Sequence, residues 1–351
     1  MESYAGNKSN CSEGVKLPLA LFAVECNSKK RLLFDVSSRK IRGVSSSVFP
    51  DATCAFENGG WLLMVQQKTR CFQEQIVFLV HPSSGRRLNL PVFPCCKEGY
   101  EGFFVFYVGA HGTPLVVARV EIWSVVPTVH IACPGDMYWS VYKHGVEPPH
   151  MSRKMRKLLE RTCIADVALL GTQVICVELS GQILIFSITE MTWGRMVPCP
   201  EWSEEDQHFL VTSHGEAVLV SHPRTMENAF RFFRLDVEAL EWSRLDDREL
   251  DDTSWFLSQG HSFRVKEAGK RRVYTFSGPK QCSDSMDSCK QTLNGMAVAS
   301  ATCFTGTSGQ SITNVYAYDL NDGTVEMVIP ASLVTELRHW VQPSIFAAPA
   351  K

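Results

Sequence analysis

A strand–turn–strand pattern recurs along the chain and constrains its fold more than any other feature. Each copy has an apolar strand, a short polar turn and a second strand with a bulky apolar residue. β-Branched and aromatic residues flanking a turn rich in Ser, Asp, Pro or Gly are typical of a β-hairpin. The six copies are Leu32–Ile41, Phe78–Leu88, Val129–Trp139, Leu184–Trp193, Phe233–Trp242 and Tyr316–Val325.

The spacing of these hairpins is nearly regular. The residues that enter the turns are Asp35, His81, Cys133, Ser187, Asp236 and Asp319, at intervals of 46, 52, 54, 49 and 83 residues. The long interval contains residues 279–312, a tract rich in Ser, Cys and Gly that we interpret as a surface insertion in the last repeat. Without it the period is near fifty, which is typical of the blades of a β-propeller.

Further apolar segments between the hairpins supply the inner strands, so each repeat has four strands. The prediction is an all-β, kelch-like chain that forms a single β-propeller of about six four-stranded blades over residues 17–347. We expect a strand in 340–346 to join the sheet that begins near residues 17–23, which closes the ring, and residues 1–16 to be a disordered tail. A pair of β-sandwiches is the alternative, but it does not explain a recurrence near fifty.

Two segments have a helical pattern. Ser152–Arg161 places Met155, Leu158 and Leu159 on one face, with Ser152 as N-cap, between the third and fourth hairpins. Ser332–His339 is a shorter candidate just before the closing strand.

Composition indicates a soluble globular chain. The sequence is 45% hydrophobic with a formal net charge of −2, and it lacks the basic excess that nucleic-acid binding needs. No apolar run is long enough for a membrane span. The thirteen cysteines contain no C-x-x-C pair, and residues 1–16 resemble neither a secretory nor a transit peptide. We therefore expect a protein of the cytoplasm or nucleus with its cysteines reduced.

Familiar catalytic signatures are missing from the sequence. It contains no dinucleotide-binding glycine motif, P-loop, nucleophile elbow or H-E-x-x-H pair. His208, His214 and His222 lie on neighbouring predicted strands, where alternation sends them to different faces. The carboxylate runs in 201–206 and 246–252 lack the spacing of a calcium loop. We predict no catalytic residue, cofactor site or metal site.

One cluster of charges stands out, and it consists of Arg153, Lys154, Arg156 and Lys157. These residues form either the solvated side of the predicted helix or a contact for an acidic partner, which long-range attraction would steer toward them. They are the candidate partner-binding residues.

Several motifs, in this order and at this spacing, resemble a plant family. Gly60–Met64 and Phe78–Pro91 look like the family's "GWL" strand and the turn that follows it, and Asp166–Ile185 is similar to its central segment. Asp236–Trp242, Tyr316–Gly323 and Trp340–Pro343 resemble its late blades. The family is the KIB-type β-propeller called domain of unknown function 295, usually found after an F-box.

In that family the F-box joins a Skp1-type subunit of a ubiquitin ligase and the propeller holds the substrate. Only sixteen residues precede Leu17, so we expect this chain to lack the F-box. The resemblance implies a non-enzymatic propeller that binds a protein partner, either a ubiquitination substrate or a ligase component. The alternative is a propeller enzyme, of hydrolase or lyase type, with a site at the central channel.

Overall fold

The structure is a computed structural model, and it describes most of the predicted propeller but not its tail or insertion. The described residues are 19–23, 31–36, 38–44, 52–67, 74–94, 102–124, 126–145, 162–194, 197–203, 206–223, 230–275, 315–329 and 336–341. The tail over 1–16, the predicted helix over 152–161 and the insertion over 279–312 lie outside these residues. The described residues contain no helix with the length and apolar character of a membrane span.

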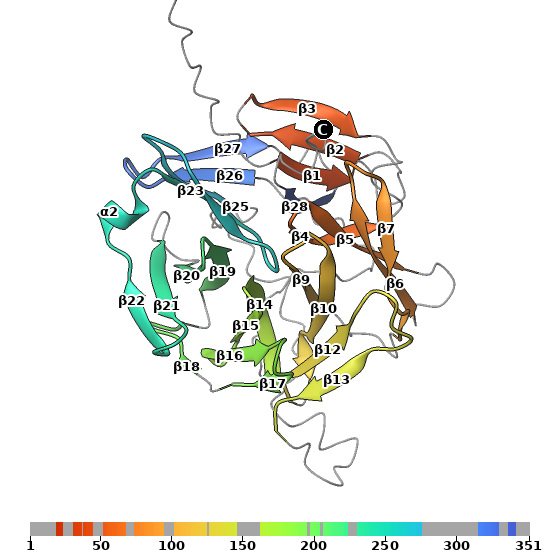
Figure 1. Cartoon of the computed structure of the whole chain (residues 1–351). Helices are drawn as coiled ribbons and strands as arrows, with labels where there is room; N and C mark the ends of the chain where they lie inside the picture. The colour runs from red at the N-terminus through yellow and green to blue at the C-terminus, as the bar shows by residue number, and fades with distance from the viewer. Residues whose placement is uncertain are drawn as a thin grey trace, which may run out of the picture.

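The strands form six sheets arranged around a ring (Figure 1). The first sheet has the order β28 (Glu336–Val341), β1 (Leu19–Ala23), β2 (Arg31–Asp35), β3 (Lys40–Val44). The second has β4 (Thr53–Asn58), β5 (Trp61–Gln67), β6 (Glu74–His81) and β7 (Arg86–Asn89), with β8 (Phe93–Pro94) paired to β6. The third has β13 (Ser140–Lys143), β12 (Thr128–Ala132), β10 (Pro114–Glu121), β9 (Gly102–Val108).

The remaining sheets follow in chain order. The fourth has β11 (Trp123–Ser124), β14 (Thr162–Leu170), β15 (Gln173–Glu178), β16 (Gln182–Ser187) and β17 (Thr192–Trp193), with β18 (Val197–Pro198) on β16. The fifth has β19 (Gln207–Ser213), β20 (Glu216–His222), β21 (Arg231–Asp236), β22 (Glu241–Arg244). The sixth has β24 (Phe263–Lys266), β23 (Thr253–Leu257), β25 (Arg271–Thr275), β26 (Val315–Asp319), β27 (Val325–Ile329).

Burial falls from the middle of each sheet to its outer strand. The central four residues of β15 and β16 are all buried, whereas most residues of the outer strands β7, β13 and β22 are exposed. Both faces of a middle strand pack against neighbouring sheets, so these strands have continuous apolar runs instead of strict alternation. The outer strands leave one edge to solvent, where polar residues are favoured.

Strands near the two ends of the described chain share one sheet. β1 pairs with β28 in antiparallel register, with Ala20 opposite Trp340. The predicted closure of the ring by an N-terminal and a C-terminal strand is therefore confirmed. The closing strand spans 336–341 and not the predicted 340–346, of which 342–346 lie outside the described residues. The predicted helix over Ser332–His339 is wrong from Glu336 onward, because pairing with β1 satisfies the backbone of Glu336–Val341 as a strand.

The prediction of six four-stranded blades is wrong. Five of the six sheets are blades, so the structure has five blades. The first five sheets are antiparallel throughout, and the second and fourth carry additional short strands. In the sixth sheet β23 lies between β24 and β25 and pairs with β25 in parallel, so this sheet is not a regular blade.

The cause of the mixed sheet is a strand that the sequence pattern did not reveal. All five residues of β23 are buried, which requires a neighbour on each side. After β24 the chain turns back past the start of β23, where the Asp252 carbonyl accepts a hydrogen bond from the Glu267 N–H at 2.7 Å. This turn places Arg271 opposite Thr253 and starts β25 on the far side of β23.

One short helix follows the fifth sheet. Helix α2 (Asp247–Leu250) begins with a capping box, in which Asp246 and Glu249 each accept a hydrogen bond from the other's backbone N–H. Leu250 is buried while the acidic residues around it are exposed. The acidic run over 246–252 is therefore a helical turn with solvated carboxylates.

Candidate functional site

The centre of the ring contains a buried carboxylate, that of Asp166 in β14. Its oxygens accept hydrogen bonds from the backbone N–H groups of Val167 at 2.9 Å, Leu210 at 2.7 Å and Gly260 at 2.5 Å. Leu210 belongs to β19 and Gly260 to the turn between β23 and β24, so one side chain ties three sheets together. Burial raises the pKa of Asp166 to about 7, although the three amide donors oppose that shift.

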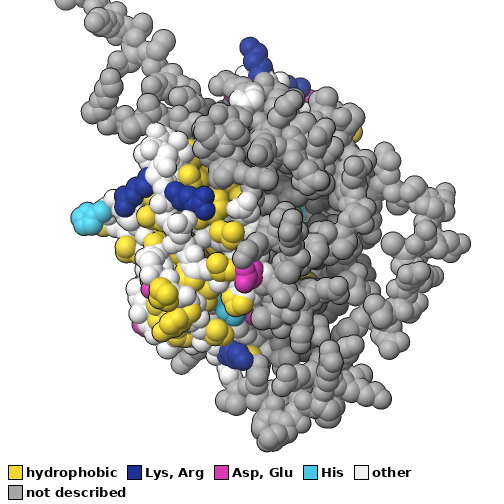
Figure 2. All heavy atoms as spheres, turned by 90° about the vertical axis from the view of Figure 1, so that its right-hand side faces the viewer, with side chains coloured by type: hydrophobic (Ala, Val, Ile, Leu, Met, Phe, Trp, Pro, Cys, Tyr) yellow, Lys and Arg dark blue, Asp and Glu magenta, His cyan; other side chains and the backbone are white. Residues whose placement is uncertain are grey.

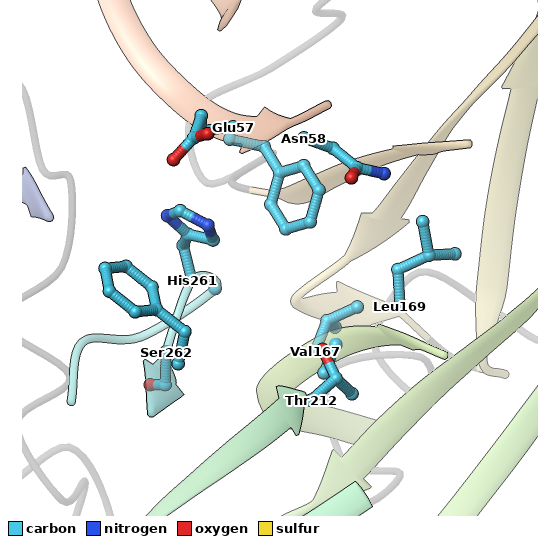
Figure 3. Close-up of a pocket in the computed structure, with 11 residues that line it drawn as sticks. Glu57, Asn58, Val167, Leu169, Thr212, His261 and Ser262 are labelled. Carbon is cyan, nitrogen blue, oxygen red and sulfur yellow. The ribbon is translucent and has the colours of Figure 1, made fainter. Parts of the chain in front are cut away.

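A cavity of about 120 Å³ is lined in part by Val167 and Gly260, whose N–H groups bond to Asp166 (Figure 3). The polar residues that line it are Glu57, Asn58, Thr212, His261 and Ser262. The Asn58 amide donates to the Phe106 carbonyl oxygen at 2.9 Å, and the His261 ring packs edge-on against Phe56 at 4.9 Å. Pockets for small molecules usually measure about 300–1,000 Å³. This cavity is smaller. The Asn58 bond at its wall joins two neighbouring sheets, and the Ser262 hydroxyl at its wall donates within the β23–β24 turn to the Ser258 carbonyl oxygen.

The described cysteines are buried or partly buried free thiols. Burial raises the pKa of Cys163 and Cys199 to about 12, and it raises the pKa of Cys176 further still. A thiol with a raised pKa stays protonated at neutral pH and is a poor nucleophile or metal ligand. Within the described part of the chain no group of three His, Cys, Asp or Glu residues is placed to hold a metal ion.

The three histidines that the sequence places near one another have separate environments. His208 and His222 lie on opposite faces of the sheet, because His208 is opposite Ser221 and His222 is opposite Gln207. The His208 ring stacks on Trp202 with 3.8 Å between centroids, and the His222 ring stacks on Phe230 at 4.2 Å. His214 lies exposed in the turn between β19 and β20. The prediction that they occupy different faces is confirmed for the two strand residues.

The most exposed apolar side chains of the described residues lie on the outer part of the ring. Met137 is 87% exposed and Tyr138 is 75% exposed, and both belong to the turn between β12 and β13. Val92, after β7, and Val141, in β13, are about half exposed. We call these four residues the rim surface. Figure 2 looks onto the side of the ring that bears β7 and β13, and hydrophobic side chains gather in its described part.

A buried tryptophan holds the rim surface together. The Trp139 indole N–H donates to the Pro91 carbonyl oxygen at 2.9 Å, and its ring meets Phe93 edge-on at 5.4 Å. Tyr138 precedes Trp139 and Val92 follows Pro91, so this hydrogen bond joins the two exposed segments. The Asp136 carboxylate accepts from the Cys133 N–H at 2.7 Å and fixes the turn itself. The exposed side chains are thus carried by an ordered support.

The structure does not test the partner-binding residues predicted from the sequence. Arg153, Lys154, Arg156 and Lys157 lie outside the described residues. The turn over 133–139 lies within the predicted hairpin Val129–Trp139, but no role was predicted for Met137 and Tyr138. The available signal was a pair of large apolar residues at a turn, where polar residues are usual.

A comparison with protein families finds a match whose fold agrees with the observed architecture. The sequence model of the KIB1-4 beta-propeller matches residues 33–278, which is more than half of the chain. The chain belongs to the KIB1-4 beta-propeller family. No curated protein matches the chain in sequence.

The solved structures that match the chain are distant from it in sequence and have low TM-scores. A putative 6-phosphogluconolactonase from Bacteroides uniformis is 12% identical, with 92% of this chain and 99% of that chain covered and a TM-score of 0.40. The β-propeller domain of Cps50 (Swd1) from Myceliophteria thermophila is 9% identical, with 90% and 98% covered and a TM-score of 0.36. AztD from Citrobacter koseri is 7% identical, with 72% and 76% covered and a TM-score of 0.37.

Proposed function

We propose that the chain is a protein-interaction propeller that binds its partner through the rim surface. The observation that carries this proposal is the gathering of Val92, Met137, Tyr138 and Val141 around the buried Trp139. Exposed apolar groups that cluster on one part of a surface mark interaction sites more often than scattered ones do. Tyr and Met are also enriched in protein interfaces.

The rim surface is suited to binding because its support is rigid. Side chains that are already ordered lose less conformational entropy when a partner binds, and more of the contact energy then contributes to affinity. Loops held by a rigid ring carry function in many folds. The hydrogen bonds made by Trp139 and Asp136 supply this order here.

A finer proposal concerns the biological role. We propose that the chain acts without catalysis, like the substrate-holding part of the plant F-box ubiquitin-ligase adaptors that it resembles, in the cytoplasm or nucleus. The small central cavity and the protonated thiols support a role without catalysis. The five free cysteines among the described residues support a reducing compartment.

Quantitative affinity purification of the tagged full chain tests the proposal. We expect the double variant Met137→Ser, Tyr138→Ser to lose its specific partner proteins by at least tenfold, because truncation of interface hot spots typically costs 2 kcal/mol or more. Met327→Ser is the matched control, since Met327 is 50% exposed on the sixth sheet. Partners that persist with the double variant and disappear with the control would refute the rim surface as the binding site.

A further inference from the structure

We infer that the partner contributes an extended segment, with acidic residues beside apolar ones, that lies along the outer strand β13. This inference rests on the proposed function and specifies the chemistry of the partner. It combines the charges around the rim surface with the direction of the hydrogen-bonding groups of β13.

The exposed charged residues of β7 and β13, the outer strands on either side of the rim surface, are all basic. Arg86 and Arg87 are exposed on β7, and Lys143 is exposed on β13, whereas Asp136 is the acidic residue of the β12–β13 turn. Figure 2 shows Lys and Arg side chains beside the gathered hydrophobic ones. A partner with Asp or Glu next to its apolar residues complements this distribution.

The two arginines of β7 differ from several arginines elsewhere in the ring that form ion pairs. Arg231, Arg264 and Arg271 pair with Asp206, Glu216 and Asp247 in turn. Arg86 and Arg87 form no ion pair within the described residues, and their guanidinium groups lie over Trp61 at 5.7 Å and Phe78 at 3.7 Å. Arg87 also donates from Nε to the Asn89 side-chain oxygen at 2.9 Å. Neither arginine is neutralised by a carboxylate of the described residues, so both can meet a carboxylate of the partner.

The strand β13 presents backbone groups along its outer edge. The His144 N–H donates to the Pro127 carbonyl oxygen at 2.9 Å, toward β12. Backbone groups of successive residues point to opposite sides of a strand, so the groups of Tyr142 also face β12 and those of Val141 face away from it. Within the described residues β13 is the last strand of its sheet. An extended segment can add to such an edge, with its side chains meeting those of the sheet.

A selection experiment tests the chemistry of the partner. The full chain is immobilised and used to select ten-residue peptides from a random display library at low salt, and single peptides are then measured by fluorescence anisotropy. We expect the selected peptides to contain Asp or Glu beside apolar residues and to bind at least tenfold more weakly in high salt. Selected peptides that are basic or uncharged, or a selection that yields none, would overturn the inference.

Variants of the chain locate the contact. We expect Arg86→Glu with Arg87→Glu to weaken peptide binding at least tenfold, while Arg248→Glu, an exposed arginine of α2, has no effect. If this charge reversal unfolds the chain, the double variant Arg86→Gln, Arg87→Gln replaces it, because it removes the two positive charges without adding negative ones. Val141→Pro removes the outward N–H, so it should bind more weakly than Val141→Ala. Equal binding by these two variants would refute strand addition.

The two proposals fail in different ways. Loss of partner binding with the Met137, Tyr138 variant, together with unchanged binding after reversal of Arg86 and Arg87, supports the proposed function and overturns the acidic segment. The occupant is then a partner without an acidic segment, such as a folded surface or a second copy of the chain. Retention of partner binding in both variants overturns the proposed function as well.

Discussion

Asp166 is the residue on which the centre of the ring depends most. Its carboxylate accepts three backbone hydrogen bonds, from its own strand, from β19 and from the β23–β24 turn. An asparagine has one acceptor oxygen and turns an N–H₂ group toward at least one of these donors. Because an unsatisfied buried donor is costly, the contacts of Asp166 stabilise the junction of three sheets.

We therefore expect Asp166→Asn to lower the free energy of unfolding by about 1–3 kcal/mol at pH 5, where the Asp166 carboxyl is protonated and carries no buried charge. Urea denaturation followed by tryptophan fluorescence measures the change. Asp136→Asn is the control, because Asp136 is exposed and its loss should cost less than about 1 kcal/mol. An equal effect of the two substitutions would show that the three central hydrogen bonds contribute no special stability.

The raised pKa of Asp166 also predicts how stability depends on pH. The folded chain binds this proton with a pKa of about 7, and the unfolded chain has the ordinary value of 3.8. Protonation therefore favours the folded state, and the contribution of this carboxyl to stability rises as pH falls from about 7 toward 3.8. We expect the stability of the wild type relative to Asp166→Asn to increase by on the order of 2 kcal/mol between pH 8 and pH 5.

Asp166→Asn is the control in that comparison, because it shares every other titrating group with the wild type. Burial, for example, lowers the pKa of His222 to about 4, so the contribution of His222 to stability decreases as pH falls. This decrease is the same in the wild type and in the variant. A difference between the two proteins that stays constant or shrinks below pH 7 would show that the amide donors outweigh burial at Asp166.

At the level of secondary-structure elements, the β23–β24 turn is the least tolerant connection near the centre. Gly260 has a φ of +77°, and a Cβ placed there would lie 2.9 Å from the Phe103 ring. Gly215, in the turn between β19 and β20, has the same φ of +77° but nothing within 4 Å of its Cβ position. Substitutions at these two glycines therefore distinguish the cost of a left-handed backbone from the cost of a steric clash.

We expect Gly215→Ala to cost about 1 kcal/mol through the left-handed backbone alone. Gly260→Ala should cost at least about 2 kcal/mol more, because Phe103 must move and the hydrogen bond to Asp166 is disturbed. Thermal melting of the two variants and the wild type gives the comparison. Equal melting temperatures for the variants would mean that the contact with Phe103 relaxes without cost.

The elements that the sequence predicts best are the hairpins, because their turns carry a local signal. The strand β23 was missed, since its five residues are all buried and show no alternation. Glu336–His339 belongs to a segment with a helical pattern and yet forms part of a strand, because β1 supplies its hydrogen-bond partners. Both errors come from tertiary contacts that no local pattern records.

For the molecule as a whole, the recurrence near fifty residues was enough to predict a propeller, and the family match agrees with it. It was not enough to count the blades, because strand order in the sixth sheet depends on the return of the chain past Asp252. The rim surface was missed for a related reason. Whether Met137 and Tyr138 are buried or exposed depends on how the third sheet meets its neighbours.

The central claim is that the rim surface contacts the partner, and site-specific photocrosslinking in cells tests it most directly. A benzoyl-phenylalanine is introduced in place of Tyr138 in one version of the full chain and in place of the exposed His214 in another. We predict a defined crosslinked product with a partner protein from position 138 and none from position 214. A product from position 214 alone, or none from position 138, would contradict the claim.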